Sequence, residues 1–214
     1  HHIVMAGSAK PYLQVRNPFN NAQTYTQYIY RSSPDTVGDS EEDAIILELD
    51  AANMIIDGHI ALFGGRYDDI LEEVAFTETS IIATGSSQST NFYTTSNQLQ
   101  PLTIGNGNAT ICDPVSYPLP QPDQNANNCS DAIVIALPKD NFSALTMSST
   151  FGGSAQDFGK SLDVTPDGRV ILSGTTVSPS ILGHTGFQGG FSDGFVAILA
   201  PITTAGSGLI ELHY

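Results

Sequence analysis

Three segments of the chain repeat one pattern, and this repetition constrains the fold more than any other feature. Each segment starts with Asp and continues as an apolar run: DAIILELD from Asp43, DAIVIALP from Asp131 and DGFVAILA from Asp193. An FGG tripeptide follows Asp43 at 63–65 and Asp131 at 151–153, after 20 residues in both cases. Independent anchors that recur at matching distances indicate a tandem array of structural units.

A third signal recurs beside these anchors. HIVMAGS ends at Ser8, SIIATGS at Ser86 and RVILSGT at Thr175. Each unit contains short apolar runs separated by Gly, Asp or Pro turns, which is typical of antiparallel strands joined in a meander. The sequence therefore predicts an all-β fold built from four-stranded units.

Residues 68–76 (DDILEEVAF) are the one segment whose local propensity favours a helix. Their repeat partner at 157–164 (DFGKSLDV) contains Gly159 and has little helical character. Apolar residues fall two or four positions apart in both copies, which fits one face of a strand. We therefore expect a strand at 68–76.

Four-stranded units at a period of about 60 to 90 residues indicate the blades of a β-propeller. The segments 151–176 (FGGSAQDFGKSLDVTPDGRVILSGTT) and 192–199 (SDGFVAIL) resemble the bacterial seven-bladed β-propeller repeat, and 91–101 (NFYTTSNQLQP) resembles a loop of that family. The matching positions are Asp157, Asp167, Gly168, Gly174, Ser192, Asp193 and Phe195.

The resemblance implies a propeller fold and, because members of that family are commonly secreted or surface-displayed bacterial proteins, an extracellular or cell-surface location. Some members are cargo of type IX secretion. The chain departs from the family at Thr79 and Ser80, which replace the usual Asp-Gly.

The expected architecture is a partial β-propeller of about three four-stranded antiparallel blades with two long inter-strand insertions. Residues 1–65 form a partial blade (strands two to four) with an insertion at 8–42; residues 66–153 form a blade with an insertion at 86–130; residues 154–214 form a blade that stops before the next Gly-Gly. The eleven expected strands leave bare sheet edges. We therefore expect a segment of a longer chain, or a piece completed by partner subunits, with further blades as its partners.

The two insertions emerge between the second and third strands of their units. The spacing from the strand glycine to the next Asp is 19 residues after Gly174, but 36 after Gly7 and 46 after Gly85. Loops held by a rigid scaffold are where binding residues usually lie. Both insertions should project from the same face of the array.

Aromatic residues concentrate in these insertions and are the candidate binding residues. They are Tyr12, Tyr25, Tyr28, Tyr30, Phe92, Tyr93 and Tyr117. Tyr combines a wide apolar contact area with a polar tip, which suits protein and sugar partners alike. The alternative is that these rings pack each long loop onto its own blade or a neighbouring domain.

Cys112 and Cys129 enclose 16 residues rich in Pro, Asn and Asp. Such a loop is a poor place to bury a thiol, so we expect a disulfide, with two free thiols in a flexible loop as the alternative. A disulfide implies an oxidising compartment. No signal peptide is visible at the start of the chain, which a fragment explains better than a cytoplasmic protein does.

The charge balance restricts the classes of partner. The chain has 7 Lys and Arg against 22 Asp and Glu, a formal net charge of −15. Such a surface repels phosphate backbones and anionic lipids, which argues against nucleic-acid and membrane-surface binding. No apolar run reaches the ~18 residues that would suggest a membrane span, so no membrane insertion is expected.

Signals for metals and catalysis are weak. Asp35, Asp39 and Glu41 lie in an acidic run whose oxygens could hold Ca²⁺, although a solvated acidic loop is the alternative. Asp69 and Asp157 occupy equivalent places after Gly-Gly and are expected to cap turns. The sequence has no nucleophile elbow and no metalloprotease or dinucleotide motif, so we expect no enzymatic activity and no cofactor.

These observations favour a non-enzymatic scaffold or protein-interaction module of adhesin type. The alternative is a glycan-binding module that uses the loop aromatics as stacking platforms.

Overall fold

The computed structural model describes most of the chain, and the described part consists of strands, turns and loops. The described residues are 2–9, 26–31, 42–52, 55–65, 67–89, 91–100, 130–186 and 191–214. Over these ranges there is no helix, so the all-β prediction is confirmed.

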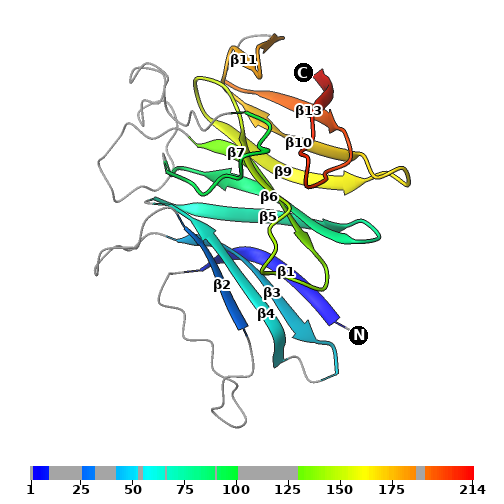
Figure 1. Cartoon of the computed structure of the whole chain (residues 1–214). Coiled ribbons are helices and arrows are strands. Elements are labelled where there is room, and N and C mark those ends of the chain that lie inside the picture. The colour runs from blue at the N-terminus through cyan, green and yellow to red at the C-terminus, as the bar shows by residue number, and fades with distance from the viewer. Residues whose placement is uncertain are drawn as a thin grey trace.

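Three four-stranded sheets follow one another along the chain (Figure 1). The first, in the order β1-β3-β4-β2, consists of β1 (His2–Ala9), β2 (Thr26–Arg31), β3 (Asp43–Asp50) and β4 (Ile55–Gly64). The second, β5-β6-β7-β8, consists of β5 (Asp69–Phe76), β6 (Ser80–Ser87), β7 (Asp131–Pro138) and β8 (Met147–Phe151). The third, β14-β13-β10-β9, consists of β9 (Asp157–Val164), β10 (Val170–Thr176), β13 (Asp193–Leu199) and β14 (Leu209–His213).

The repeat anchors predict which strands are equivalent. β6 and β10 each pair with an opening strand on one side and with a third strand on the other, antiparallel throughout the second and third sheets. Both opening strands, β5 and β9, carry a β-bulge, at Glu72 and at Lys160. Because the bulges fall at the same repeat position, the two sheets have the same local geometry.

The predicted strand at 68–76 is confirmed as β5. Leu71 is buried, whereas Glu72 is exposed at the bulge and Phe76 is exposed beside the following turn. A helix would satisfy the local propensity of this segment but would leave the edge of β6 unpaired, so sheet pairing outweighs propensity here.

The first insertion contributes a strand that the repeats do not predict. β2 pairs in parallel with β4, with Thr26 opposite His59 and Arg31 opposite Gly64. The first sheet is therefore four-stranded rather than three-stranded, and it is not wholly antiparallel. The additional strand β2 covers the outer edge of β4, whose backbone groups would otherwise be unpaired. The short ribbon β11 (Ser180–Ile181) with β12 (His184–Thr185) is likewise not predicted.

The sheets stack face to face, with the second sheet between the other two (Figure 1). Ile133 and Ile135 of β7 pack toward the first sheet, and Ala132 and Val134 pack toward the third. β7 is consequently buried along nearly its whole length and reads as a continuous apolar run. The core of the protein therefore consists of two apolar layers, one on each face of the second sheet.

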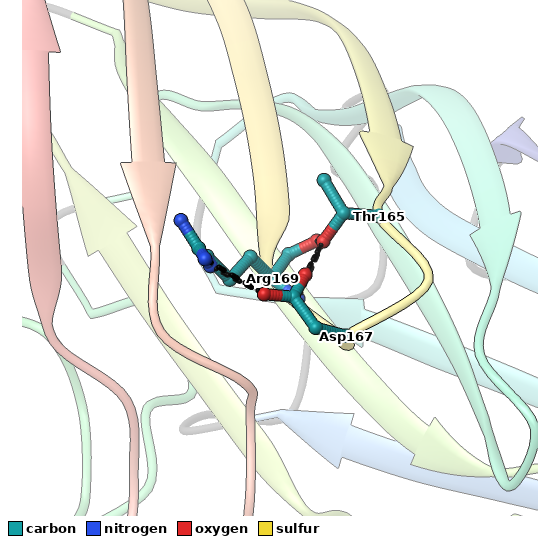
Figure 2. A network of polar contacts seen from close by, with 3 residues as sticks. All are labelled: Thr165, Asp167 and Arg169. Carbon is teal, nitrogen blue, oxygen red and sulfur yellow. Dashed lines mark hydrogen bonds and ion pairs between the residues drawn. The ribbon is translucent and has the colours of Figure 1, made fainter.

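The hairpin between β9 and β10 is closed by a polar network (Figure 2). The Thr165 hydroxyl donates to Asp167, and Arg169 Nε donates to the other carboxylate oxygen of Asp167 at 2.8 Å. Gly168 has a φ of 83°, a left-handed conformation that Gly adopts at little cost. This turn precedes β10, whereas the insertions follow β1 and β6, the equivalents of β10. The predicted Asp-Gly turn therefore lies at the end of the sheet opposite to the insertions.

The layered core predicts that two similar side-chain truncations lower the free energy of unfolding by different amounts. Ile133→Ala removes a side chain that is 0% exposed, so the free energy of unfolding should fall by about 2–5 kcal/mol. Ile210→Ala removes one that is 47% exposed and should change it by less than about 0.5 kcal/mol. Denaturant unfolding of both variants tests this, and equal costs would contradict the layered core.

Candidate functional site

Both insertions leave the fold at one end of the stack. Ala9 pairs with Asp43 at the base of the first insertion, and Ser87 pairs with Asp131 at the base of the second. Because β1 and β6 are equivalent strands, the two bases lie at the same end of the sheets (Figure 1). This insertion end is the candidate functional site.

Many of the sequence predictions fall on residues outside the described part of the chain. They are Tyr12, Tyr25 and Tyr117, the cysteines Cys112 and Cys129, and the acidic residues Asp35, Asp39 and Glu41. Tyr28 lies in β2, but its side chain is also outside the description. The binding, disulfide and calcium interpretations at these positions stay predictions.

Tyr30 fixes the first insertion to the core. Its ring stacks on Phe63 of β4 with 5.1 Å between centroids and an 8° angle between planes. Its hydroxyl donates to the carbonyl of Phe142, and its ring also meets Tyr93 of the second insertion at 5.8 Å. The structure thus brings one predicted aromatic from each insertion together.

The second insertion begins with a buried ring. Phe92 is 1% exposed and belongs to the core between the first and second sheets, whereas Tyr93 is half-buried. The Phe92 ring is therefore not exposed to a partner. For Tyr30 and Phe92 the contacts are those of rings that pack an insertion onto the sheets.

The same insertion then runs along the outer edge of the second sheet. Thr95 N donates to the Ser148 carbonyl of β8, and Ser148 N donates to Thr95 Oγ1, both at 3.0 Å. Asn97 Nδ2 donates to the Thr146 carbonyl at 3.0 Å and to the Thr203 carbonyl of the third sheet's last loop at 3.3 Å. The first insertion therefore covers the outer edge of the first sheet at β4. The second insertion covers the outer edge of the second sheet at β8.

A buried carboxylate holds the connection between the first and second sheets at this end. Asp69 Oδ2 accepts hydrogen bonds from Gly65 N at 2.9 Å and from Ser89 Oγ at 2.8 Å. The backbone N of Asp69 donates to the Glu42 carbonyl at 2.7 Å. One residue thus joins the Gly-Gly turn, the end of β6 and the end of the first insertion.

The connection between the second and third sheets repeats this arrangement. Asp157 Oδ2 accepts hydrogen bonds from Gly153 N and Ser178 Oγ, both at 2.7 Å. Asp157 N donates to the Ser130 carbonyl at 2.6 Å, where the second insertion ends. The expected turn-capping role of Asp69 and Asp157 is confirmed in both copies.

A second buried aspartate faces each of these carboxylates across a glycine. A Cβ atom placed on Gly152 would lie 2.5 Å from Asp131 Oδ1 and 2.9 Å from Asp157 Oδ2. Only Gly leaves room for two carboxylates at this point. Neither oxygen of Asp131 has a hydrogen-bond partner among the described residues.

Burial raises the pKa of each of these carboxyl groups. It raises the pKa of Asp131 to about 8, with a further contribution from the charge of Asp157. It raises the pKa of Asp69 to about 8 although hydrogen bonds from Ser87, Ser89 and Gly65 act in the opposite direction. The pKa of Asp157 rises to about 6 for the same reason, desolvation. Asp131 and Asp157 are both fully buried. This arrangement therefore suits a role in stabilising the junction between sheets rather than proton exchange with a substrate.

The spacing of the repeats contains a signal for these carboxylate pairs, which a search for neighbouring acidic residues does not find. Asp43 and Asp69 are 26 residues apart, and so are Asp131 and Asp157. Asp68, which is adjacent to Asp69, instead accepts a hydrogen bond from Glu42 N at 2.9 Å. The paired carboxylates come from different strands that the fold brings together.

Comparisons with known proteins do not assign this chain to a family. No protein-family model matches it, and no curated protein matches its sequence. Within the described ranges, no three His, Cys, Asp or Glu side chains are grouped to hold a metal ion. Nor do those ranges include a helix long and apolar enough to cross a bilayer.

The buried pairs predict a pH dependence of stability with a definite sign. Asp131 has a pKa near 8 in the folded chain against 3.8 in the unfolded chain, so between these values the folded state holds the extra proton. The free energy of unfolding should therefore fall as pH rises from 4 to 8, by up to about 1.4 kcal/mol per pH unit for each such group. Asp131→Asn should flatten this slope and raise stability at pH 8.

The matched control is Asp167→Asn, in the exposed hairpin. The hydrogen bond from Thr165 and the neighbouring Arg169 lower the pKa of Asp167, so this group stays ionised between pH 5 and 8. Urea unfolding at pH 5, 6.5 and 8 distinguishes the two variants. An unchanged slope in Asp131→Asn would show that Asp131 is ionised in the folded protein.

Proposed function

We propose that this chain is part of a β-propeller and that it serves as a scaffold presenting its two insertions to a protein partner. The sheets would be the blades, and the protein would be secreted or displayed on a cell surface. Further blades, from the same chain or from partner subunits, would pack against the outer sheets. In this proposal the chain has no enzymatic role.

The way the sheets stack supports the propeller. β9 packs against β5 and β6 of the preceding sheet, and β5 packs against β1 and β3 of the sheet before it. Opening strands therefore meet along one side of the stack, where Lys160 Nζ binds Glu72 Oε1 at 2.6 Å between the two equivalent bulges. Such a repeated sheet-to-sheet step, continued, generates blades around an axis.

The observation that carries the interaction role is the anchoring of both insertions at one end. The contact between Tyr30 and Tyr93 joins them, and the backbone N–H groups of Asp69 and Asp157 bond the carbonyls of the residues with which they end. Binding loops usually lie on a rigid base of this kind. Residues 101–129, between two anchored ends, are the segment we propose for partner contact.

Photo-crosslinking on cells that display the protein tests this role. Benzoylphenylalanine replaces Tyr117 in the second insertion and Ile29 of β2, which is 60% exposed. The matched control replaces Phe76, which is 47% exposed at the opposite end of the stack. Covalent protein adducts should form from the two insertion sites and not from Phe76.

Two other outcomes would contradict the proposed role. Equal adducts from all three sites would indicate non-specific contact. Absence of protein adducts, together with glycan-array binding that is lost on Tyr12→Ala or Tyr117→Ala, would favour the glycan-binding alternative.

The extracellular location depends on the predicted disulfide. Cys112 and Cys129 enclose a loop of 16 residues, and closing it should stabilise the folded state by roughly 3 kcal/mol in the chain-entropy model. Intact-mass analysis after alkylation should show no labelled cysteine without reductant and two with it. Two labelled thiols in unreduced protein would contradict the predicted disulfide, and with it the main argument for an extracellular location.

A further inference from the structure

Buried polar atoms without partners gather at the junction between the second and third sheets. Asp131, at the start of β7, is 0% exposed, and neither of its carboxylate oxygens has a hydrogen-bond partner among the described residues. Thr150 of β8 is also 0% exposed, and its Oγ1 likewise has none there. Buried polar groups in folded proteins nearly always have a partner, so two such groups close together need an explanation.

The sheet places these two side chains beside the same glycine. Ala132 pairs with Phe151 in the ladder between β7 and β8, so Asp131 lies next to Gly152. A Cβ atom on Gly152 would lie 2.5 Å from Asp131 Oδ1, so the carboxyl group fills the space that a side chain would need. Thr150 precedes this glycine by two positions and therefore faces the same side of the sheet.

Two more oxygen-bearing side chains reach this glycine. Asp157 Oδ2 is 2.9 Å from the same Cβ position. This oxygen accepts the hydrogen bonds of Gly153 N and Ser178 Oγ, which leaves Oδ1 for a further ligand. Gln100 Oε1 lies 3.4 Å from Gly152 N. The junction therefore brings two carboxylates, an amide and a hydroxyl around one point.

Two carboxylates brought together away from water need a positive charge between them. A shared proton would satisfy only two oxygens, and a water molecule would supply hydrogen bonds but no charge. A divalent cation balances both carboxylates and binds several oxygens at once. Ca²⁺ takes 6–8 oxygen ligands, and carboxylates, side-chain amides and backbone carbonyls are the groups that supply them in proteins. Two acidic side chains are enough when other oxygens complete this set.

We propose that the junction binds a Ca²⁺ ion at the base of the second insertion. Its ligands are the oxygen-bearing side chains around Gly152, namely Asp131, Asp157, Thr150 and Gln100. The description of the chain stops at Gln100 and resumes at Ser130, next to Asp131. An ion bound by both Gln100 and Asp131 ties together the two ends of residues 101–129.

The junction between the first and second sheets has equivalent carboxylates but lacks one of the other ligands. Asp43 and Asp69 flank Gly64 as their equivalents flank the later glycine. Leu62, however, stands at the position that Thr150 occupies in β8. Because an apolar side chain cannot bind an ion, we expect Ca²⁺ at the second of the two junctions only.

This inference needs neither a propeller nor a partner at the insertion end, so it can fail separately from the proposed function. Crosslinking is scored on cells, whereas Ca²⁺ binding is measured on the isolated chain. A proton and a cation are alternative ways of balancing the two carboxylates. The pH dependence predicted above therefore describes the chain in EDTA.

Calorimetric titration of the full chain with CaCl₂ tests the site, after removal of metal with EDTA and dialysis. The chain should bind Ca²⁺ with a Kd of roughly 10⁻⁴ M or below, as extracellular calcium modules do. Asp131→Asn should remove one bound ion. Thr150→Val should weaken its binding at least about tenfold, whereas Thr150→Ser, which keeps the hydroxyl, should bind normally.

The matched control is Asp43→Asn, which removes the equivalent buried carboxylate at the first junction and should leave the number of bound ions unchanged. The acidic run of the first insertion needs a second control, because it could bind Ca²⁺ as well. A chain with Asp35→Asn, Asp39→Asn and Glu41→Gln should still lose one ion when Asp131→Asn is added. If this triple variant binds no Ca²⁺, the inference is wrong.

Hydrogen–deuterium exchange locates the ion. Saturating Ca²⁺ should slow exchange of the amides of residues 97–100 and 150–157 relative to EDTA, and Asp131→Asn should abolish this effect. Exchange in the hairpin at 165–169, at the opposite end of the sheet, should not change. If the full chain binds no Ca²⁺, or if Asp131→Asn and Asp43→Asn behave alike, the inference is wrong.

Discussion

The hydrogen bonds of one buried carboxylate per junction determine how successive sheets are joined. Asp157 holds the Gly-Gly turn and the segment after β10 through a single oxygen, and its backbone N holds the residue that precedes β7. Charge-assisted bonds to buried groups are among the stronger polar interactions in proteins. Because this arrangement is local, the chain between β6 and β7 can lengthen by many residues without altering the order of the strands.

Much of the fold could be predicted from the sequence because the units repeat. The alignment of 68–76 with 157–164 identified β5 against its helical propensity, since the copies share a strand pattern that one copy alone does not reveal. β2 could not be found in this way because it has no counterpart in the other units. Its parallel pairing with β4 depends on an edge that becomes visible only in three dimensions.

The candidate site was predicted less completely, for a similar reason. The aromatic residues of the insertions are conspicuous in the sequence, but whether a ring faces solvent or the core depends on distant contacts. Phe92 is buried by strands of two sheets, and Tyr30 lies on Phe63 of β4. The buried carboxylates also depend on long-range contacts, although their common spacing is a local clue. They lower the effective negative charge at pH 7, because the formal value of −15 counts Asp69 and Asp131 as ionised.

Asn97 has a mechanical consequence for a protein whose insertions are pulled by a partner. Its amide bonds Thr146 beside β8 and the loop at Thr203 and Thr204 of the third sheet. Force applied to the second insertion is therefore divided between two sheets and acts on several hydrogen bonds together. Bonds that share a force in this way resist it better than bonds that break one after another, so detaching the insertion at Asn97 requires contacts with both sheets to break together.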